Sequence, residues 1–553
     1  MPFFRYQQFP PINLPDRKWP NRHLKKAPIW CSVDLRDGNQ ALINPMSIVQ
    51  KLIFFDTLVE IGFKEIEVGF PAASSIEYGF IRHLIEKNKI PDDVTIQVLC
   101  QARPELIKKT IKSLAGAKKA IFHLYNSTSQ LQRRVVFQSD KQGVKDIATK
   151  STLCVKEEIK NLPGCKLTLQ YSPESFTGTE LDYSLAVLEA VSDAWQPSGN
   201  NKIILNLPAT VEMSTPNVYA DMIEWVNNNL SRREQTIISV HTHNDRGCAI
   251  AATELAILAG ADRVEGTLFG NGERTGNVDL VTLACNLYSQ GIDPALDFTD
   301  INKLVKICSE LTNLPVHVRH PYAGELVYTA FSGSHQDAIR KGIAALANKE
   351  NSFWEVPYLP VDPKDLGRIY EPIRINSQSG KGGIAFILEH SFGYQVPKKF
   401  QPEISKIIQS ISEKTGKEVL PRTIKDQFEK EFVNIDNPLK IKDFQVSRSG
   451  KNSVTVKLDI TLNNQQITQQ GVGNGLLDAI VKALSSQLGL DLNIEDYIEH
   501  SLGQASSAAA ACYVGVQING KLFFGVGTHS DTSQSSFLAL VSGINRYFNN
   551  LSS

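Results

Sequence analysis

The chain has 553 residues, which is long enough for two or more domains. Hydrophobic residues make up 42% and charged residues 21%, as in an ordinary soluble globular protein. Basic and acidic residues both number 58, and a zero net charge argues against a broad nucleic-acid-binding surface. No apolar run is as long as a membrane span, and the eight scattered cysteines without a CxxC pair favour a reducing, cytoplasmic setting.

The first 28 residues are rich in proline and aromatic residues and lack the apolar core of a secretory signal. We expect residues 1–28 to form an ordered, extended arm on the protein surface.

From Ile29 onward, short apolar runs alternate with amphipathic stretches of helical length. The expected strands are Ile29–Asp34, Glu65–Phe70, Val94–Leu99, Ala120–Tyr125, Leu167–Tyr171, Ile203–Leu207, Ile237–His241 and Arg263–Leu268. The expected helices include Ser47–Ile61, Pro104–Leu114, Val144–Lys160, Tyr183–Ala194, Asn217–Asn228 and Ala249–Ala259. This alternation predicts a parallel sheet, and eight units in about 260 residues favour a closed (β/α)₈ TIM barrel over residues 29–300. A doubly wound open sheet is the alternative.

After about residue 290 the alternation stops, and residues 301–437 are expected to form mainly helical linker subdomains. A loop at 377–383 leads into a short strand or helix at Ile384–Leu388. The charge-rich stretch 412–437 predicts a connecting helix and linker.

Residues 438–553 change to a strand-rich pattern that predicts an α+β domain. The expected strands are Asp443–Val446, Val454–Leu462, Gln466–Val472, Cys512–Ile518 and Phe523–Val526, and the expected helices are Leu476–Leu488 and Phe537–Phe548. A Gly-Val-Gly sequence precedes each helix, at 471–473 and 525–527. We interpret the domain as a duplicated ββα unit.

Two histidines, His241 and His243, stand two residues apart at the end of a buried strand. Side chains at i and i+2 of a strand point to the same face, so the pair can bind one divalent ion. Asp37 and Asn277 are further candidate ligands, because the first, seventh and eighth strands are near neighbours once a barrel closes. The alternative is that the histidines are ordinary polar residues at a strand end.

Other chemistry-bearing side chains also follow the expected strands, at the end where TIM barrels place their active sites. Arg36, beside Asp37, suits an oxyanion or enolate; the alternative is a salt bridge at the barrel mouth, for example with Glu174. The Gly270–Gly276 loop fits neither a P-loop nor a dinucleotide fingerprint, so its glycines indicate a sharp turn near the metal. His335 and Tyr370 lie beyond the barrel, and from spacing alone such residues are more often structural than catalytic.

Four motifs together closely resemble the 2-isopropylmalate synthase family and, more broadly, metal-dependent TIM-barrel lyases and Claisen-type synthases. They are Asp34–Gln40, His241–Gly247, Gly270–Asp279 and Ser377–Gly383. The resemblance covers nearly the whole chain, and Asp37-Gly38-Asn39-Gln40 is similar to the longer branch of the family. It implies condensation of acetyl-CoA with 3-methyl-2-oxobutanoate to give 2-isopropylmalate and CoA, the first committed step of leucine synthesis.

The resemblance also implies roles for individual residues. The metal ligands would be Asp37, His241, His243 and Asn277, holding Mg²⁺, with Mn²⁺ or Zn²⁺ as alternatives and K⁺ as a further activator. The catalytic residues would be Arg36, Glu174, His335 and Tyr370, the last two supplied by the partner in a domain-swapped homodimer. The substrate-binding residues would be Leu99, His123, Tyr125, Ser172 and Thr210.

The C-terminal domain resembles the family's leucine-binding regulatory domain, which implies feedback inhibition by leucine. The regulatory residues would be Gly473, Asn474, Gly475, Leu477, Tyr497 and Ala508. Leu476 stands where the family's signature normally carries proline. The run Ala505–Ala511 of mostly small residues fits a dimeric amino-acid sensor.

Two other functions compete with this prediction. One is a relative with a different acceptor, such as a citramalate or homocitrate synthase or an acyl-CoA lyase, and the pocket residues around His123 would decide between them. The other is a non-catalytic metabolite sensor on an inactive barrel, which predicts loss of a metal ligand or of Arg36. All of these residues are present.

Overall fold

The computed structural model describes residues 5, 7, 9–330, 332–346, 353–370, 381–415, 419–448, 453–502 and 508–551. The chain folds as two compact units, Met1–Val327 with Pro363–Arg368, and Tyr328–Asp362 with Ile369–Ser553. The domain bounds expected from the sequence stay predictions. Over the part of the chain that is described, no helix has both the length and the apolar character needed to cross a lipid bilayer.

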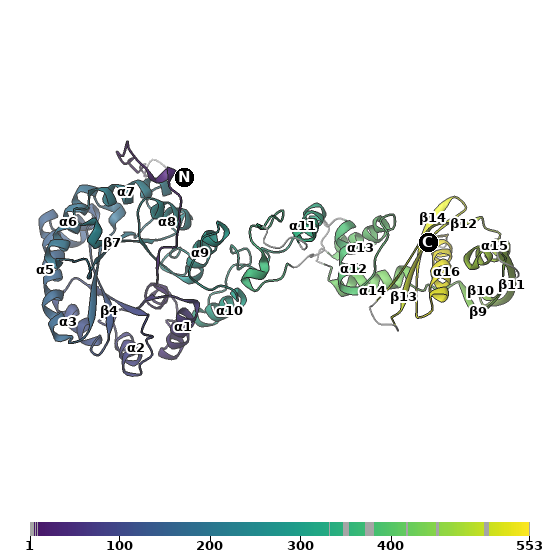
Figure 1. Cartoon of the computed structure of the whole chain (residues 1–553), viewed down its shortest axis with the longest axis horizontal. Helices are drawn as coiled ribbons and strands as arrows, with labels where there is room; N and C mark the ends of the chain where they lie inside the picture. The colour runs from purple at the N-terminus through teal and green to yellow at the C-terminus, as the bar shows by residue number, and fades with distance from the viewer. Residues whose placement is uncertain are drawn as a thin grey trace. The chain divides into compact units, whose positions relative to one another are not determined.

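The first unit is a closed barrel of eight parallel strands, which confirms the TIM-barrel prediction and excludes the open sheet (Figure 1). The strands are β1 Ile29–Ser32, β2 Glu65–Gly69, β3 Thr95–Gln101, β4 Lys119–Ser127, β5 Lys166–Glu174, β6 Ile203–Ala209, β7 Thr236–Thr242 and β8 Arg263–Gly266. Each strand pairs with the next, and β8 closes onto β1 with Ile29 opposite Arg263.

Helices cover the outside of the barrel. They are α1 Ile48–Ile61, α2 Ser75–Glu86, α3 Pro104–Ser113, α4 Gln130–Gln132, α5 Lys141–Glu158, α6 Leu181–Trp195, α7 Pro216–Asn229, α8 Ala249–Leu258, α9 Leu280–Ser289 and α10 Ile301–Thr312. In helix α1, the residues at each end explain where the helix begins and where it stops. Ser47 and Gln50 form a capping box at its start, and Gly62 ends it at φ 114°, a conformation that glycine adopts without strain.

The N-terminal arm lies against α7. The Arg17 guanidinium pairs with the Asp221 carboxylate at 2.8 Å, and the Trp19 indole N–H donates to the same carboxylate at 2.8 Å. The backbone N–H of Lys18 donates to Glu224 at 2.8 Å. Asp221 and Glu224 are buried, so the arm supplies the partners that these two carboxylates need.

In the described residues of the second unit, four helices precede two three-stranded antiparallel sheets. The helices are α11 Gly333–Leu346, α12 Lys381–Phe392, α13 Gln401–Thr415 and α14 Pro421–Phe432. The first half of the sheet region is β9 Leu439–Arg448, β10 Val454–Leu462, β11 Gln465–Gly473 and α15 Leu476–Leu488. The second half is β12 Leu492–Ser501, β13 Ala510–Ile518, β14 Lys521–His529 and α16 Thr532–Leu551.

The duplication is therefore of a βββα unit, and the ββα prediction was wrong because it missed β12. A bulge between Ile494 and Asp496 shifts the register of β12 against β13. The bulge interrupts the alternation of apolar and polar residues that would have marked the strand. The region at 384–388, expected as a strand or a helix, is part of helix α12.

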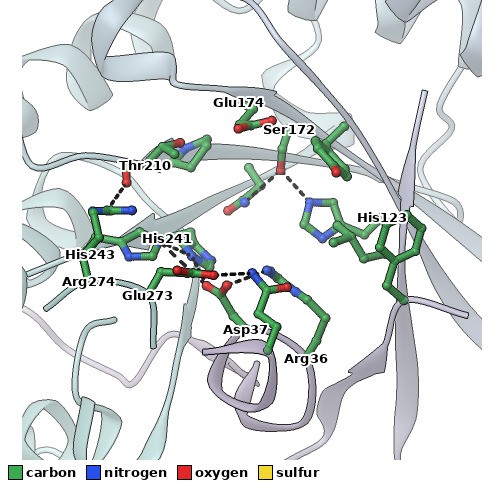
Figure 2. A pocket seen from close by; sticks show the side chains of 16 residues that line it. Arg36, Asp37, His123, Ser172, Glu174, Thr210, His241, His243, Glu273 and Arg274 are labelled. Atoms are coloured by element: carbon green, nitrogen blue, oxygen red, sulfur yellow. Dashed lines mark hydrogen bonds and ion pairs between the residues drawn. The ribbon is translucent and has the colours of Figure 1, made fainter. Parts of the chain in front are cut away.

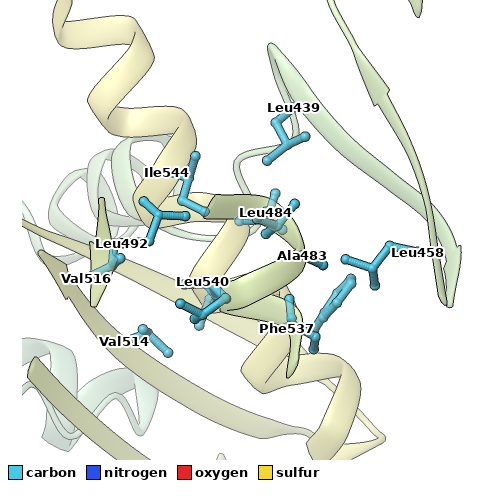
Figure 3. Close-up of a cluster of buried hydrophobic side chains, with 14 of the residues drawn as sticks. Leu439, Leu458, Ala483, Leu484, Leu492, Val514, Val516, Phe537, Leu540 and Ile544 are labelled. Carbon is cyan, nitrogen blue, oxygen red and sulfur yellow. The ribbon is translucent and has the colours of Figure 1, made fainter. Parts of the chain in front are cut away.

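In each half a helix lies directly on a strand, and the Gly-Val-Gly sequences explain how. A Cβ atom on Gly471 would collide with the Ala479 carbonyl oxygen of α15, and one on Gly525 would collide with the Ala539 carbonyl oxygen of α16. Leu484 of α15 and Leu540 of α16 enter one shared apolar core (Figure 3). The two halves therefore fold as a single domain.

Candidate active site

The turn after β1 carries Arg36 and Asp37. It is a single π-helical turn, Asp34–Gly38, in which the backbone N–H groups of Asp37 and Gly38 both donate to the Val33 carbonyl, at 2.9 and 3.2 Å. Such turns are rare and occur often at functional sites.

A buried lysine supports this turn from below. The Lys51 ammonium donates to the Leu35 carbonyl at 3.1 Å and pairs with the Glu77 carboxylate. The second oxygen of Glu77 accepts the backbone N–H of Phe70, after β2, at 3.3 Å. The side chain of Lys51 is fully buried. One ion pair therefore holds the turns after β1 and β2 together.

The structure brings the four predicted metal ligands together (Figure 2 shows three of them). Asp37 Oδ2 lies 3.1 Å from His241 Nε2 and 3.8 Å from His243 Nε2. The two histidine Nε2 atoms are 3.3 Å apart, and Asn277 Nδ2 lies 2.8 Å from Asp37 Oδ2. One ligand atom each from Asp37, His241 and His243 fits within 4.8 Å, close enough to hold one ion.

Two buried atoms of this cluster have no partner among the described residues, Asn277 Oδ1 and His243 Nδ1. Rotating the Asn277 amide would exchange its two ends and place Oδ1 beside Asp37 and His241, where a metal ligand is needed. The carboxylate, amide and imidazole donors suit a divalent ion. The residues present therefore fit a metal site.

The pKa values of Asp37 and His243 also suit metal binding. Burial raises the pKa of Asp37, but the charge of Arg36 and the hydrogen bond with His241 outweigh it and hold that pKa well below its usual range. Burial and the nearby His241 lower the pKa of His243 to about 4, so His243 is neutral, as a ligand must be. Burial lowers the pKa of His241, but its hydrogen bonds to Asp37 and Glu265 outweigh this and raise the pKa to about 9, so this ring has to release a proton when it binds a metal.

Beneath the cluster lies a layer of polar side chains. They are Glu67, Gln97, His123, Gln170, Asn206, Arg263 and Glu265. Glu265 lies 3.0 Å from His241 Nδ1 and accepts from the Arg263 guanidinium at 2.8 Å. A carboxylate on the far nitrogen of a metal-binding histidine fixes its tautomer and ring orientation. Glu265 is therefore placed to aim His241 at the metal position.

Glu67 connects Arg36 to the pocket wall. It accepts from Arg36 Nε at 2.5 Å and lies 2.7 Å from His123 Nδ1. The other nitrogen of His123 lies 2.7 Å from the Ser172 hydroxyl. His123 and Ser172, predicted from separate strands, therefore lie side by side. Arg36 pairs with Asp37 at 2.8 Å and with Glu67, and the mouth salt bridge suggested with Glu174 is replaced by these two contacts.

A cavity of about 430 Å³ opens above the cluster. Its lining includes the predicted residues Arg36, Asp37, Leu99, His123, Tyr125, Ser172, Glu174, Thr210, His241 and His243. Burial raises the pKa of Glu174. The Thr210 hydroxyl accepts the backbone N–H of Ser175 at 2.9 Å, so its proton can still be donated into the cavity.

Sequence reasoning missed part of the lining. Residues not assigned to the site are Gln40, Phe70, Asn206, Pro208, Glu273 and Arg274. The polar layer could have been predicted, because Glu67, Gln97 and Glu265 are polar residues within otherwise apolar strands. Side chains of a barrel strand alternate between the interior and the helices, so such residues had to face the barrel interior.

The remaining predicted residues lie in the second unit. His335 on α11 is exposed, and its ring stacks on Tyr358 at 4.0 Å. The Tyr370 hydroxyl is buried, without a partner among the described residues, and burial raises its pKa to about 12. Their catalytic roles stay predictions.

The predicted regulatory residues divide between the two halves of the sheet region. Gly473, Asn474, Gly475 and Leu477 lie at the β11–α15 junction, where the Asn474 N–H donates to Asp478 at 2.8 Å. Tyr497 on β12 and Ala508, just before β13, belong to the second half. A leucine site made from both groups stays a prediction.

Comparisons with known proteins agree with this arrangement. Residues 27–307 match the HMGL-like family, residues 325–389 match "Alpha-isopropylmalate synthase, post-catalytic domain-like", and residues 418–548 match the LeuA allosteric (dimerisation) domain. Proteins named 2-isopropylmalate synthase are similar over nearly the whole chain. That of Ralstonia nicotianae is 52% identical, covering 99% of this chain and 95% of its own length. Those of Clostridium acetobutylicum and Parafrankia sp. are also 52% identical, covering 99% of this chain and 99% and 98% of their own lengths.

Proposed function

The chain belongs to the 2-isopropylmalate synthase family, and we propose that its barrel condenses acetyl-CoA with 3-methyl-2-oxobutanoate. The products are (2S)-2-isopropylmalate and CoA, in the first committed step of leucine synthesis. The observation that carries the proposal is the convergence of Asp37, His241, His243 and Asn277 at one edge of the barrel cavity.

The proposed metal is Mg²⁺, with Mn²⁺ or Zn²⁺ as alternatives that the same ligands would accept. Asp37, His241, His243 and Asn277 would hold it. When bound, a divalent ion would polarise the ketone of the oxo acid and favour attack on its carbon.

The reaction joins two carbon atoms and then releases a thiol. A base removes a proton from the acetyl methyl group, and that carbon bonds to the ketone carbon, whose oxygen takes up a proton. Water then adds to the thioester, the C–S bond breaks and CoA leaves as the thiol. His335 and Tyr370, proposed to come from the partner subunit, are acid–base candidates.

Residues of the barrel would bind and stabilise the reacting groups. The Arg36 guanidinium, held by Asp37 and Glu67, is fixed where it can stabilise negative charge that develops on an oxygen. Leu99 and the His123–Ser172 pair would shape the space for the branched side chain. The Thr210 hydroxyl would donate to the substrate carboxylate.

A homodimer is part of the proposal. The LeuA allosteric (dimerisation) match supports it. All eight cysteines are free, which supports the proposed cytoplasmic setting.

Release of CoA thiol from acetyl-CoA, measured with a panel of 2-oxo acids, tests the function. We expect 3-methyl-2-oxobutanoate to give the highest kcat/KM, EDTA to abolish the activity and Mg²⁺ or Mn²⁺ to restore it. Pyruvate or 2-oxoglutarate as the better acceptor would instead indicate a citramalate or homocitrate synthase. Activity that is unchanged by EDTA would contradict the metal site.

Leucine inhibition is tested with a point variant, because truncation near residue 435 would damage the fold. Phe428 and Phe432 of α14 pack in one core with Phe524 of β14, and removing the sheets would expose that core. Replacing Tyr497 by alanine is the cleaner change. Its hydroxyl donates to Glu499 at 2.6 Å and contacts the Ser536 hydroxyl at 2.8 Å.

We expect Tyr497→Ala to raise the leucine concentration for half-inhibition about tenfold, the effect of losing about 1.4 kcal/mol of binding. Initial-rate assays at increasing leucine measure it. Ile498→Ala is the matched control, since the next residue of a strand faces the other side and Ile498 is similarly exposed, at 40% against 43%. Equal inhibition of the wild type and Tyr497→Ala would remove Tyr497 from the regulatory site.

A further inference from the structure

Glu212, in the loop after β6, organises the segment that follows His243. One oxygen, Oε2, accepts the backbone N–H groups of Arg246 at 2.5 Å and Cys248 at 3.4 Å. Its own backbone N–H donates to Asp245 at 2.9 Å. Glu212 is only 7% exposed, so a negative charge is buried beside the loop after β7.

The other oxygen of Glu212 is unsatisfied. Oε1 is buried and has no hydrogen-bond partner among the described residues, and the same is true of His243 Nδ1. Both residues line one small cavity between the loop after β6, the end of β7 and α8. This cavity leaves about 10 Å³ for the centre of a water-sized sphere, close to the least space that one water molecule needs.

The chemistry of His243 requires a partner at this place. Its Nε2 faces Asp37 and His241, at 3.8 and 3.3 Å, so Nε2 is the nitrogen available to a metal. Nδ1 of the neutral ring must then carry the proton and donate it. An unpaired N–H donor and an unpaired carboxylate acceptor beside the same small cavity each carry a cost that one bridging molecule would remove.

We propose that one ordered water molecule occupies this cavity, accepting from His243 Nδ1 and donating to Glu212 Oε1. Glu212 is thereby a positioning residue for the metal site, acting through the water as Glu265 acts directly on His241. The two histidines are then held differently, one by a carboxylate at 3.0 Å and the other through a replaceable molecule. The inference rests on the proposed metal site, and its test measures metal binding without turnover.

The test is a titration of metal-stripped, full-length protein with Mn²⁺, in which the EPR signal of free Mn²⁺ gives the Kd. Glu212→Gln keeps the shape, but its one oxygen is needed by the two backbone N–H groups, so its NH₂ group faces the water and the hydrogen that the water donates loses its acceptor. Ala252→Val adds two methyl groups at the wall of the cavity and displaces the water while leaving Glu212 in place. We expect each variant to raise the Kd about tenfold, the lower end for loss of an outer partner of a metal ligand.

Glu224→Gln is the matched control. Glu224 is also a buried carboxylate that accepts a backbone N–H, but it lies on α7 against the N-terminal arm. Its Kd should stay within about twofold of the wild type, well below the change expected for an outer partner of a ligand. His243→Ala removes a proposed metal ligand and shows how weakly Mn²⁺ binds without an intact site. Wild-type protein that binds Mn²⁺ no better than His243→Ala would contradict the proposed metal site, an outcome distinct from failure of the water bridge.

Two outcomes overturn the water bridge. One is an unchanged Kd in both variants. The other is a weaker Kd in Glu212→Gln alone, which would mean that Glu212 acts only through the loop. If Ala252→Val does not fold, a wild-type crystal structure that resolves ordered water decides. Density within about 2.7–3.2 Å of both His243 Nδ1 and Glu212 Oε1 supports the bridge, and an empty cavity overturns it.

Discussion

Replacement of Asp37 by alanine is expected to lower the rate of CoA release at least about a thousandfold. The substitution removes the only carboxylate among the four proposed ligands and leaves Arg36 without one of its two anionic partners. Charge stabilisation by a metal contributes several kcal/mol to a transition state, and each 1.36 kcal/mol is a factor of ten in rate. Steady-state thiol release with acetyl-CoA and 3-methyl-2-oxobutanoate measures the change.

Asp34→Asn is the control for this experiment. Asp34 begins the same π-helical turn and is also buried, and burial raises its pKa to about 7 despite hydrogen bonds from Ser32 and Leu268. An amide resembles the protonated carboxyl that is abundant at neutral pH, so this variant should retain most of the activity. EDTA-sensitive turnover by Asp37→Ala at near wild-type rate would remove Asp37 from the metal site.

Replacement of Arg263 by methionine is expected to lower the free energy of unfolding of the barrel by about 3–5 kcal/mol, the usual cost of breaking a buried ion pair. The Arg263 guanidinium is fully buried and donates to Glu65 at 2.5 Å, to Glu265 at 2.8 Å and to Gln97 at 2.8 Å. Methionine fills similar volume but removes the guanidinium that pairs with both Glu65 and Glu265 in the barrel interior.

Urea unfolding followed by tryptophan fluorescence measures this loss, since four of the five tryptophans lie in the barrel unit. Arg232→Met is the control, because Arg232 pairs with Asp193 on the surface, where side-chain exposures are 38% and 64%. Exposed pairs contribute only about 0–1 kcal/mol. Equal destabilisation by the two variants would show that the interior network does not depend on Arg263.

Much of the barrel could be predicted because its strands are short, continuous apolar runs and its helices are amphipathic. Helix α1 was expected to begin at Ser47, and Ser47 proved to be its cap. Strand β12 was missed for a physical reason, since its bulge puts apolar residues out of phase. Prediction from the alternation of apolar and polar residues therefore fails where a bulge breaks that alternation.

The candidate site also contains residues that could be predicted from the sequence and residues that could not. The metal ligands could be predicted because His241 and His243 share a face at the end of β7 and Asp37 follows β1, which only β8 separates from β7. The contacts of Glu67 and Glu265 could not be predicted, because which interior charges meet depends on the stagger of strands around the closed barrel. His335 and Tyr370 belong to the second unit, and their approach to the chemistry depends on subunit arrangement, which residue spacing does not encode.

The ion pair between Lys51 and Glu77 limits how this enzyme can be re-engineered. It joins the carbonyl of Leu35, next to Arg36, to the N–H of Phe70, whose side chain lines the substrate cavity. Substitutions in the Phe70 loop, made to admit bulkier oxo acids, would also displace the turn that carries Arg36 and Asp37. Acceptor range and catalytic power are thus coupled through one salt bridge. Broadening the range of acceptors without loss of catalytic rate therefore requires Lys51 and Glu77 to be retained.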